Sequence, residues 1–236
     1  MNYILTTQNL TKSYGGPPAL NGISLQLPAG KIIGLLGPNG SGKTTLLKLA
    51  AGILTPTSGS IEIDGKPVGF ETKAVVSYLP DRTYLRNNQN IGDQLDFFQD
   101  FYPDFDRMRA EGMLYDLGIS PNTRFGTLSK GNKEKVQLVL VMSRRAKLYL
   151  LDEPIGGVDP AARDYILRTI VTNYDPEATV LISTHLIADV EQVLDGFVFL
   201  WNGTVVRSGL ADEVRAETGK TLDELFREVF RCSANY

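Results

Sequence analysis

The sequence predicts an α/β fold, in which a mainly parallel sheet flanked by helices carries an N-terminal antiparallel β subdomain and a helical insertion. One observation is an apolar, strand-like run at residues 31–36 that leads through a glycine-rich loop into a helix-like run. A second is a pair of apolar runs, 148–151 and 180–182, typical of strands buried on both faces of a parallel sheet and separated by a helical stretch at 161–174. A third is the helical spacing of apolar residues within 91–145.

The N-terminal residues are expected to form antiparallel strands. Segments 4–14 and 23–27 alternate apolar and polar residues, and residues 28–30, Pro-Ala-Gly, predict a tight turn into the next strand. Segment 61–65 has the composition of a short strand that ends in a turn, and segment 74–79 that of a further strand.

The insertion at 91–145 is expected to form a helical lobe with its own small core, because apolar stripes at helical spacing are usually core. Pro103 and Pro121 break the helices. The stripe contains Leu95, Phe98, Phe101, Met108, Met113, Leu114, Leu117, Val136, Val139 and Leu140.

Composition indicates a soluble globular protein. The chain has 236 residues, 22% charged and 42% hydrophobic, with a formal net charge of −3, so no basic footprint for nucleic acid is expected. The longest strictly apolar stretches, 138–142 and 197–201, are far shorter than the ~20 residues that span a bilayer. No signal peptide is recognisable, and the single cysteine, Cys232, allows no internal disulfide. A cytosolic location is therefore expected.

The glycine-rich loop has the complete pattern of a phosphate-binding P-loop in the strand–loop–helix context that such a loop requires. Its backbone N–H groups and the positive end of the following helix would surround a polyphosphate, the lysine would add a cation, and the first threonine would place a hydroxyl on Mg²⁺. The sequence therefore predicts that this chain binds a nucleoside triphosphate through Gly37, Pro38, Asn39, Gly40, Ser41, Gly42, Lys43, Thr44 and Thr45.

Two adjacent carboxylates, Asp152 and Glu153, end the buried run that begins at residue 148. Downstream of a P-loop, Asp152 is expected to hold Mg²⁺ directly or through water, and Glu153 to polarise the water that attacks the γ-phosphate. The only histidine, His185, follows the run at 180–182. A lone histidine is more often structural, but the carboxyl ends of parallel strands converge on the ligand crevice, so we expect His185 to face the γ-phosphate.

Together with these features, Thr127-Leu128-Ser129-Lys130-Gly131-Asn132 resembles the signature of the ATP-binding-cassette (ABC) ATPases, whose usual form is Leu-Ser-Gly-Gly-Gln. The resemblance covers nearly the whole chain. It follows the family's order, with Tyr14 upstream, then the P-loop, Leu79-Pro80-Asp81, the signature, the acidic strand, Gly156-Gly157-Val158-Asp159 and His185.

This resemblance implies a head-to-tail dimer in which the P-loop of one cassette and the signature of the other sandwich each ATP. Ser129, Gly131 and Asn132 would then face the partner's nucleotide from a helix start, although Ser129 is also an ordinary helix cap. Asp159 would cross the interface, or cap the helix that follows it. Tyr14 would stack on adenine; such stacking tolerates any base, so the choice of ATP comes from the resemblance.

Two positions depart from the family pattern. Asp81 stands where glutamine is usual; because carboxylate oxygen suits hard cations, we expect Asp81 still to contact metal or water. Lys130 and Asn132 replace the usual glycine and glutamine of the signature, but Ser129 and Gly131 remain, so the signature is expected to work.

The domain layout that follows is a single ABC ATPase domain over 1–236. Residues 1–90 with 146–209 would form the nucleotide-binding α/β core and antiparallel subdomain, 91–145 the helical subdomain with the signature, and 210–236 a short helical C-terminal segment.

The expected function is that of a transport-coupled ATPase, the nucleotide-binding subunit of a membrane transporter whose spanning permease subunits are separate polypeptides. Resemblance to single-cassette subunits favours an exporter of antibiotics, peptides or lipids. The chain would lie on the cytoplasmic face of the membrane, with a permease helix docked near Tyr84, Leu85, Phe97 and Phe98, which are equally candidates for packing. The alternative is a soluble ABC ATPase in an assembly or regulatory complex; a GTPase or small-molecule kinase is disfavoured because no Asn-Lys-x-Asp motif occurs.

Overall fold

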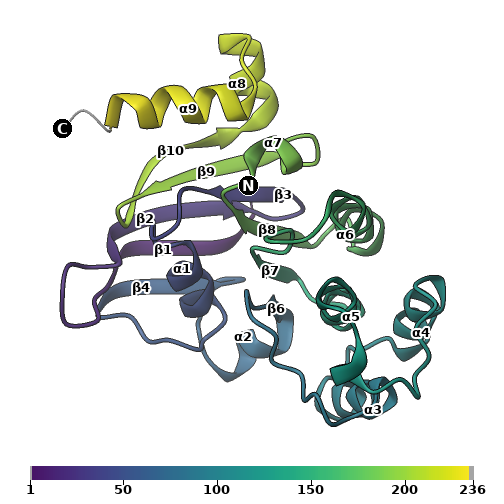
Figure 1. Cartoon of the computed structure of the whole chain (residues 1–236). Coiled ribbons are helices and arrows are strands. Elements are labelled where there is room, and N and C mark those ends of the chain that lie inside the picture. Colours follow the sequence, from purple (N-terminus) through teal and green to yellow (C-terminus); the bar gives the residue numbers. More distant parts are fainter. Residues whose placement is uncertain (1, 234–236) are drawn as a thin grey trace.

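Two sheets form the framework of the protein in the computed structural model, which describes residues 2–233 (Figure 1). The larger has the order β10-β9-β3-β8-β7-β6, and its strands are parallel except for β10, which pairs with β9 in an antiparallel hairpin. Its strands are β3 (Ile32–Leu36), β6 (Val76–Leu79), β7 (Leu148–Asp152), β8 (Thr179–Thr184), β9 (Gly196–Trp201) and β10 (Thr204–Leu210).

The smaller sheet is antiparallel and has the order β2-β1-β4-β5. It contains β1 (Tyr3–Lys12), β2 (Leu20–Pro28), β4 (Ser58–Ile63) and β5 (Lys66–Pro67). Side chains alternate along β2 between buried and exposed positions, as its sequence predicts. By contrast, every residue of β3, β7 and β8 is buried, as expected for central parallel strands. The predicted α/β class is confirmed.

Helices cover the larger sheet and form a separate lobe (Figure 1). In Figure 1, α8 and α9 lie beyond β10 at one end of the molecule, and α3 and α4 lie at the opposite end. The helices are α1 (Lys43–Ala50), α2 (Phe70–Val75), α3 (Ile91–Phe101), α4 (Arg107–Asp116), α5 (Lys130–Met142), α6 (Pro160–Asn173), α7 (Ile187–Val190), α8 (Ala211–Thr218) and α9 (Leu222–Ser233), with a short 3₁₀ turn at Phe125–Thr127.

Helix α5 contributes to two hydrophobic cores. Val136, Val139 and Leu140 belong to the core of the helical lobe, together with buried residues of α3 and α4. Leu138 and Val141 belong to a second core, which joins β7, β8 and β9 to α6 and α9. A third core fills the space between the two sheets around α1. The helix that begins at the signature is therefore packed against the lobe and the nucleotide-binding core at once.

Two details of the sequence prediction are wrong. Phe101 and Met108 were expected in the lobe core but are 66% and 84% exposed. Met108 lies off the buried face of α4, which is formed by Ala110, Met113 and Leu114, and Phe101 is in the last turn of α3, where it stacks on the exposed Phe97. In addition, the strand expected from residue 74 begins at 76, because α2 extends to residue 75.

Candidate functional site

The glycine-rich loop joins β3 to α1 and closes tightly around its own lysine. Gly42 has a φ of 107°, and a Cβ added there would lie 2.5 Å from the carbonyl oxygen of Ala19, so only glycine fits. The Lys43 ammonium donates to the carbonyl oxygens of Gly37 and Pro38, at 2.8 and 3.1 Å. Burial lowers the pKa of Lys43, while the nearby Glu153 acts in the opposite direction. The loop thus holds a buried cation at the start of a helix.

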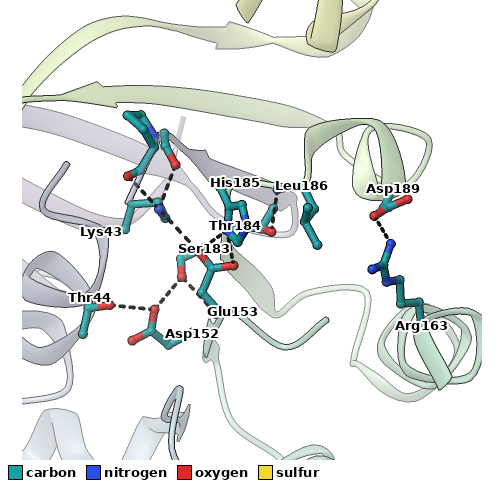
Figure 2. Close-up of polar contacts among 12 residues, drawn as sticks. Lys43, Thr44, Asp152, Glu153, Arg163, Ser183, Thr184, His185, Leu186 and Asp189 are labelled. Carbon is teal, nitrogen blue, oxygen red and sulfur yellow. Dashed lines mark hydrogen bonds and ion pairs between the residues drawn. The ribbon is translucent and has the colours of Figure 1, made fainter. Parts of the chain in front are cut away.

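Asp152 lies at the carboxyl end of β7, beside the residue of β8 that pairs with it, Ser183. One carboxylate oxygen, Oδ1, accepts hydrogen bonds from the hydroxyls of Thr44 (3.1 Å) and Ser183 (2.6 Å), as Figure 2 shows. The other, Oδ2, is buried and has no protein partner among the described residues. Burial raises the pKa of Asp152, since the charged form loses hydration. An unpartnered carboxylate oxygen beside a P-loop threonine is a fitting ligand for Mg²⁺.

Glu153 is held through its backbone by Ser183 and through its carboxylate by Lys43 and His185 (Figure 2). Its backbone N–H donates to the carbonyl oxygen of Ser183 (3.0 Å) and to the Ser183 hydroxyl (3.1 Å). Its carboxylate lies 3.4 Å from the Lys43 ammonium and 3.1 Å from Nδ1 of His185. Glu153 also has a φ of 48°, a left-handed conformation that few non-glycine residues adopt and that is enriched at functional sites.

Asp81 lies beside these acids. It follows β6 and lines a cavity of about 230 Å³ together with Glu134, Asp152 and Glu153. The Asp81 carboxylate is 37% exposed and lies 4.0 Å from Nε of Arg82. Its charge contributes to the raised pKa of Asp152, after the larger effect of burial. The aspartate therefore faces the same space as the predicted metal ligand and base.

The signature residues begin α5, and Ser129 caps it by accepting a hydrogen bond from the backbone N–H of Asn132 (3.3 Å). A Cβ added at Gly131 would meet no atom within 4 Å, so this end of the helix is open. The Lys130 side chain contacts two residues of the same chain. Its ammonium lies 3.5 Å from the carbonyl oxygen of Gly157 and 3.8 Å from the Glu134 carboxylate.

The remaining predicted residues lie on loops. Asp159 caps α6, accepting a hydrogen bond from the backbone N–H of Ala162 (3.0 Å), which is the structural role weighed for it. Tyr14 is 62% exposed on the loop after β1, with the Lys12 ammonium 5.3 Å from its ring centre. Within one chain, the structure therefore brings Lys43, Thr44, Asp152, Glu153 and His185 together, with Asp81 beside them.

The sequence reasoning missed the role of Ser183. This residue is fully buried, and its hydroxyl bonds to Asp152 and to the backbone of Glu153. Its position at the carboxyl end of a strand, two residues before His185, was a signal that the sequence contained. The sequence did not reveal the strand register, which places Ser183 directly opposite Asp152.

A P-loop between a strand and a helix, with an acidic pair at the end of a nearby strand, defines this chain as a P-loop nucleoside triphosphatase. Comparison with known proteins narrows the class. Residues 20–156 match the model of the ABC transporter family, and the chain belongs to that family. It is an ATP-binding subunit of the ABC transporter type, and hence an ATPase.

Relatives align over nearly the full chain. The ABC-type transporter ATP-binding protein EcsA of Bacillus subtilis is 30% identical, with 99% of each chain covered. The lantibiotic transport ATP-binding protein SrtF of Streptococcus pyogenes is 29% identical over 94% of this chain and 96% of its own. A solved ATP-binding subunit of an ABC transporter superposes with a TM-score of 0.86 at 29% identity, covering 96% of this chain and 99% of that one. These likenesses favour the transporter subunit over the soluble assembly factor. Among residues 2–233, the helices are all too short or too polar to cross a bilayer.

Proposed function

We propose that this chain hydrolyses Mg²⁺-bound ATP to drive a membrane permease made of separate polypeptides, and that the transporter is an exporter. The observation that carries the proposal is the cluster around Ser183, which joins a P-loop lysine and threonine to an acidic pair and a histidine. Export is supported by the relative named for lantibiotic transport.

Each residue of the cluster would have a separate role in ATP hydrolysis. Thr44 and the free Oδ2 of Asp152 would hold Mg²⁺, which offsets phosphate charge when bound. Glu153 would accept a proton from the attacking water, and His185 would donate to the γ-phosphate. For Asp81 we propose a contact with metal or water; unchanged Mg²⁺ dependence and turnover in Asp81→Ala would refute that role.

Nucleotide binding would be an exchange of partners for Lys43. In the structure its ammonium bonds to two loop carbonyls and pairs with Glu153. A β/γ-phosphate carries more negative charge than those partners and would draw the lysine away.

The dimer would complete the site. Ser129, Gly131 and Asn132 would present the open start of α5 to the γ-phosphate bound by a second cassette, identical or related. Asp159 would contact that cassette, and Tyr14 would stack on the adenine. Closure would depend on the γ-phosphate, so hydrolysis would reopen the pair and move the permease.

The variant Glu153→Gln tests this mechanism, with Glu177→Gln on an exposed loop as the matched control. The Glu153→Gln protein should bind ATP, hydrolyse it ~10²-fold more slowly or worse, and accumulate as a dimer on size exclusion with ATP. The control should behave as the parent does. A Glu153→Gln chain that remains monomeric with ATP at high concentration would refute the dimer mechanism.

Permease association is tested by recovery of the chain from detergent-solubilised membranes. A stoichiometric polytopic partner would support transport and a peripheral location on the cytoplasmic face. Recovery with only soluble partners would instead support the assembly alternative.

A further inference from the structure

Residues 154–159, here called the linking loop, join the acidic pair to α6. The loop first turns back on the pair, because the backbone N–H of Gly156 donates to the carbonyl oxygen of Glu153 at 3.0 Å. At its other end the loop caps α6. Between these two anchors, the carbonyl oxygens of Gly157 and Val158 each accept a hydrogen bond from a cationic side chain. The proposed function assigns no role to these two carbonyls.

One of the two cations, Arg163, also contacts the segment that follows His185. Its Nε donates to the Val158 carbonyl oxygen at 3.2 Å, and its Nη1 lies 2.7 Å from Oδ2 of Asp189. Asp189 belongs to α7, which begins two residues after His185, and Figure 2 shows the ion pair together with that segment. Arg163 therefore fastens the linking loop and α7 to the same point of α6.

The other cation, Lys130, is the first residue of α5. Its ammonium lies 3.5 Å from the carbonyl oxygen of Gly157. Gly157 has a φ of 71°, and a Cβ added there would lie 3.0 Å from the ammonium, so a side chain at this position would crowd the lysine. The usual signature has glycine at position 130, which has no side chain to make this contact. The link between α5 and the linking loop therefore depends on the departure from the family pattern at Lys130.

Ordinary surface electrostatics is the alternative reason for these two cations. Lys130 is the first and Arg163 the fourth residue of its helix, and the positive end of a helix dipole does not favour a cation. The side chains of Arg163 and Asp189 are 29% and 37% exposed, and an ion pair so open to solvent contributes little to stability. Neither effect explains why two helices hold two successive carbonyls of one loop.

We propose that Lys130 and Arg163 are positioning residues for His185, and that they act through the linking loop. The inference rests on the proposed role of His185, whose Nδ1 lies 3.1 Å from the Glu153 carboxylate. That contact and the pair of Arg163 with Asp189 join the linking loop and the segment after His185 at two points. A displacement of Lys130 at the start of α5 would therefore move the histidine that faces the γ-phosphate.

The ring of His185 provides a direct test, because it is the only histidine in the chain and its NMR signals report on it alone. Lys130→Met and Arg163→Met should each shift these signals in the full chain without nucleotide and without a histidine tag. In the Arg163→Met background, Lys130→Met should add no further shift, because the connection is already broken. Arg168→Met, at an exposed position of α6, is the matched control and should leave the signals unchanged.

The opposite result of this cycle would overturn the inference. A shift caused by Lys130→Met that persists in the Arg163→Met background would mean that the lysine charge acts on His185 directly through space. Absence of any shift in the Lys130→Met protein would show that α5 and His185 are not connected.

A charge swap separates the proposed role from that of an ordinary ion pair. Arg163→Glu/Asp189→Lys restores opposite charges at the two positions, but a carboxylate at position 163 cannot donate to the Val158 carbonyl. We expect the swap to regain parental stability in urea unfolding, while the His185 signals stay displaced as in Arg163→Met. Return of the His185 signals to their parental positions in the swap would overturn the inference.

Turnover provides a second readout. Lys130→Met and Arg163→Met should each lower kcat about 3- to 30-fold. The affinity of the isolated chain for ATP should not change, because the contacts of both side chains lie outside the P-loop. Arg168→Met should keep the parental kcat. Unchanged kcat in both variants would overturn the inference and leave the transporter proposal intact, whereas unchanged hydrolysis in Glu153→Gln would overturn the proposed function as well.

Discussion

The hydroxyl of Ser183 provides the sharpest test of how the site is organised. It is fully buried and donates a 2.6 Å hydrogen bond to the Asp152 carboxylate, so Ser183→Ala removes a bond to a charged acceptor. Such bonds contribute about 1.5–3 kcal/mol. The Glu153 N–H keeps the Ser183 carbonyl as acceptor, at 3.0 Å, so its lost second contact adds little. We therefore expect the free energy of unfolding to fall by about 1.5–3 kcal/mol.

Ser77 provides a matched control. Its hydroxyl is also buried in the larger sheet, but it donates to the neutral carbonyl of Val141 at 3.0 Å. Ser77→Ala should cost only about 0.5–1.5 kcal/mol, measured for both variants by urea unfolding of the nucleotide-free protein. The Ser183→Ala and Ser77→Ala variants should also differ in their Mg²⁺ dependence. Loss of a ligand-orienting hydrogen bond weakens metal binding about 10–100-fold, so Ser183→Ala alone should need more Mg²⁺ for half-maximal ATP hydrolysis.

A specific pair of results would refute this reasoning. If Ser183→Ala destabilised the protein no more than Ser77→Ala, and both kept the parent's Mg²⁺ dependence, Ser183 would not organise the acidic pair. Greater destabilisation with an unchanged Mg²⁺ dependence would restrict its role to folding.

Other predictions concern the loop, the lobe and acid stability. Gly42→Ala should abolish ATP binding in a filter or fluorescence assay, because its Cβ meets a carbonyl at 2.5 Å; Gly40→Ala, with no atom within 4 Å, should weaken binding less. Arg144→Met should cost about 3–5 kcal/mol in urea unfolding, since a largely buried ion pair is broken, against about 0–1 kcal/mol for the exposed Arg145→Met. Hydrogen bonding from the first turn of α4 lowers the pKa of Asp106, so its ionised form stabilises the native state at neutral pH and that contribution is lost as pH falls through the lowered pKa. Asp106→Asn should therefore lower stability at pH 7 but not in strong acid, and an equal loss at both pH values would contradict this.

Local signals explain what the sequence could predict. The strand, loop and helix around Lys43 are contiguous, and the acids of residues 152 and 153 follow a run whose composition alone indicates a buried strand. Tertiary placement explains the rest. The exposure of Met108 depends on which face of α4 meets the lobe, and the role of Ser183 depends on strand register. Neither quantity is encoded in spacing along the chain.

Ser129 and Asp159 show what a single chain cannot test. Ser129 and Asp159 were predicted both as caps and as contacts to a second cassette. The caps are present in the single chain, and the contacts remain predictions because they require two chains. The capping bonds are compatible with the proposed roles, since an N-cap residue stays at the exposed start of its helix.

The helical lobe is one long connection between two neighbouring parallel strands, β6 and β7. Residues 82–126, which precede the signature, can therefore differ in length or shape without altering which strand lies beside which. Asp81 follows β6 and Asp152 ends β7, so a change confined to residues 82–126 would leave the cluster around Ser183 in place. This connection separates a part of the fold that can vary from the part that must keep its geometry for ATP hydrolysis.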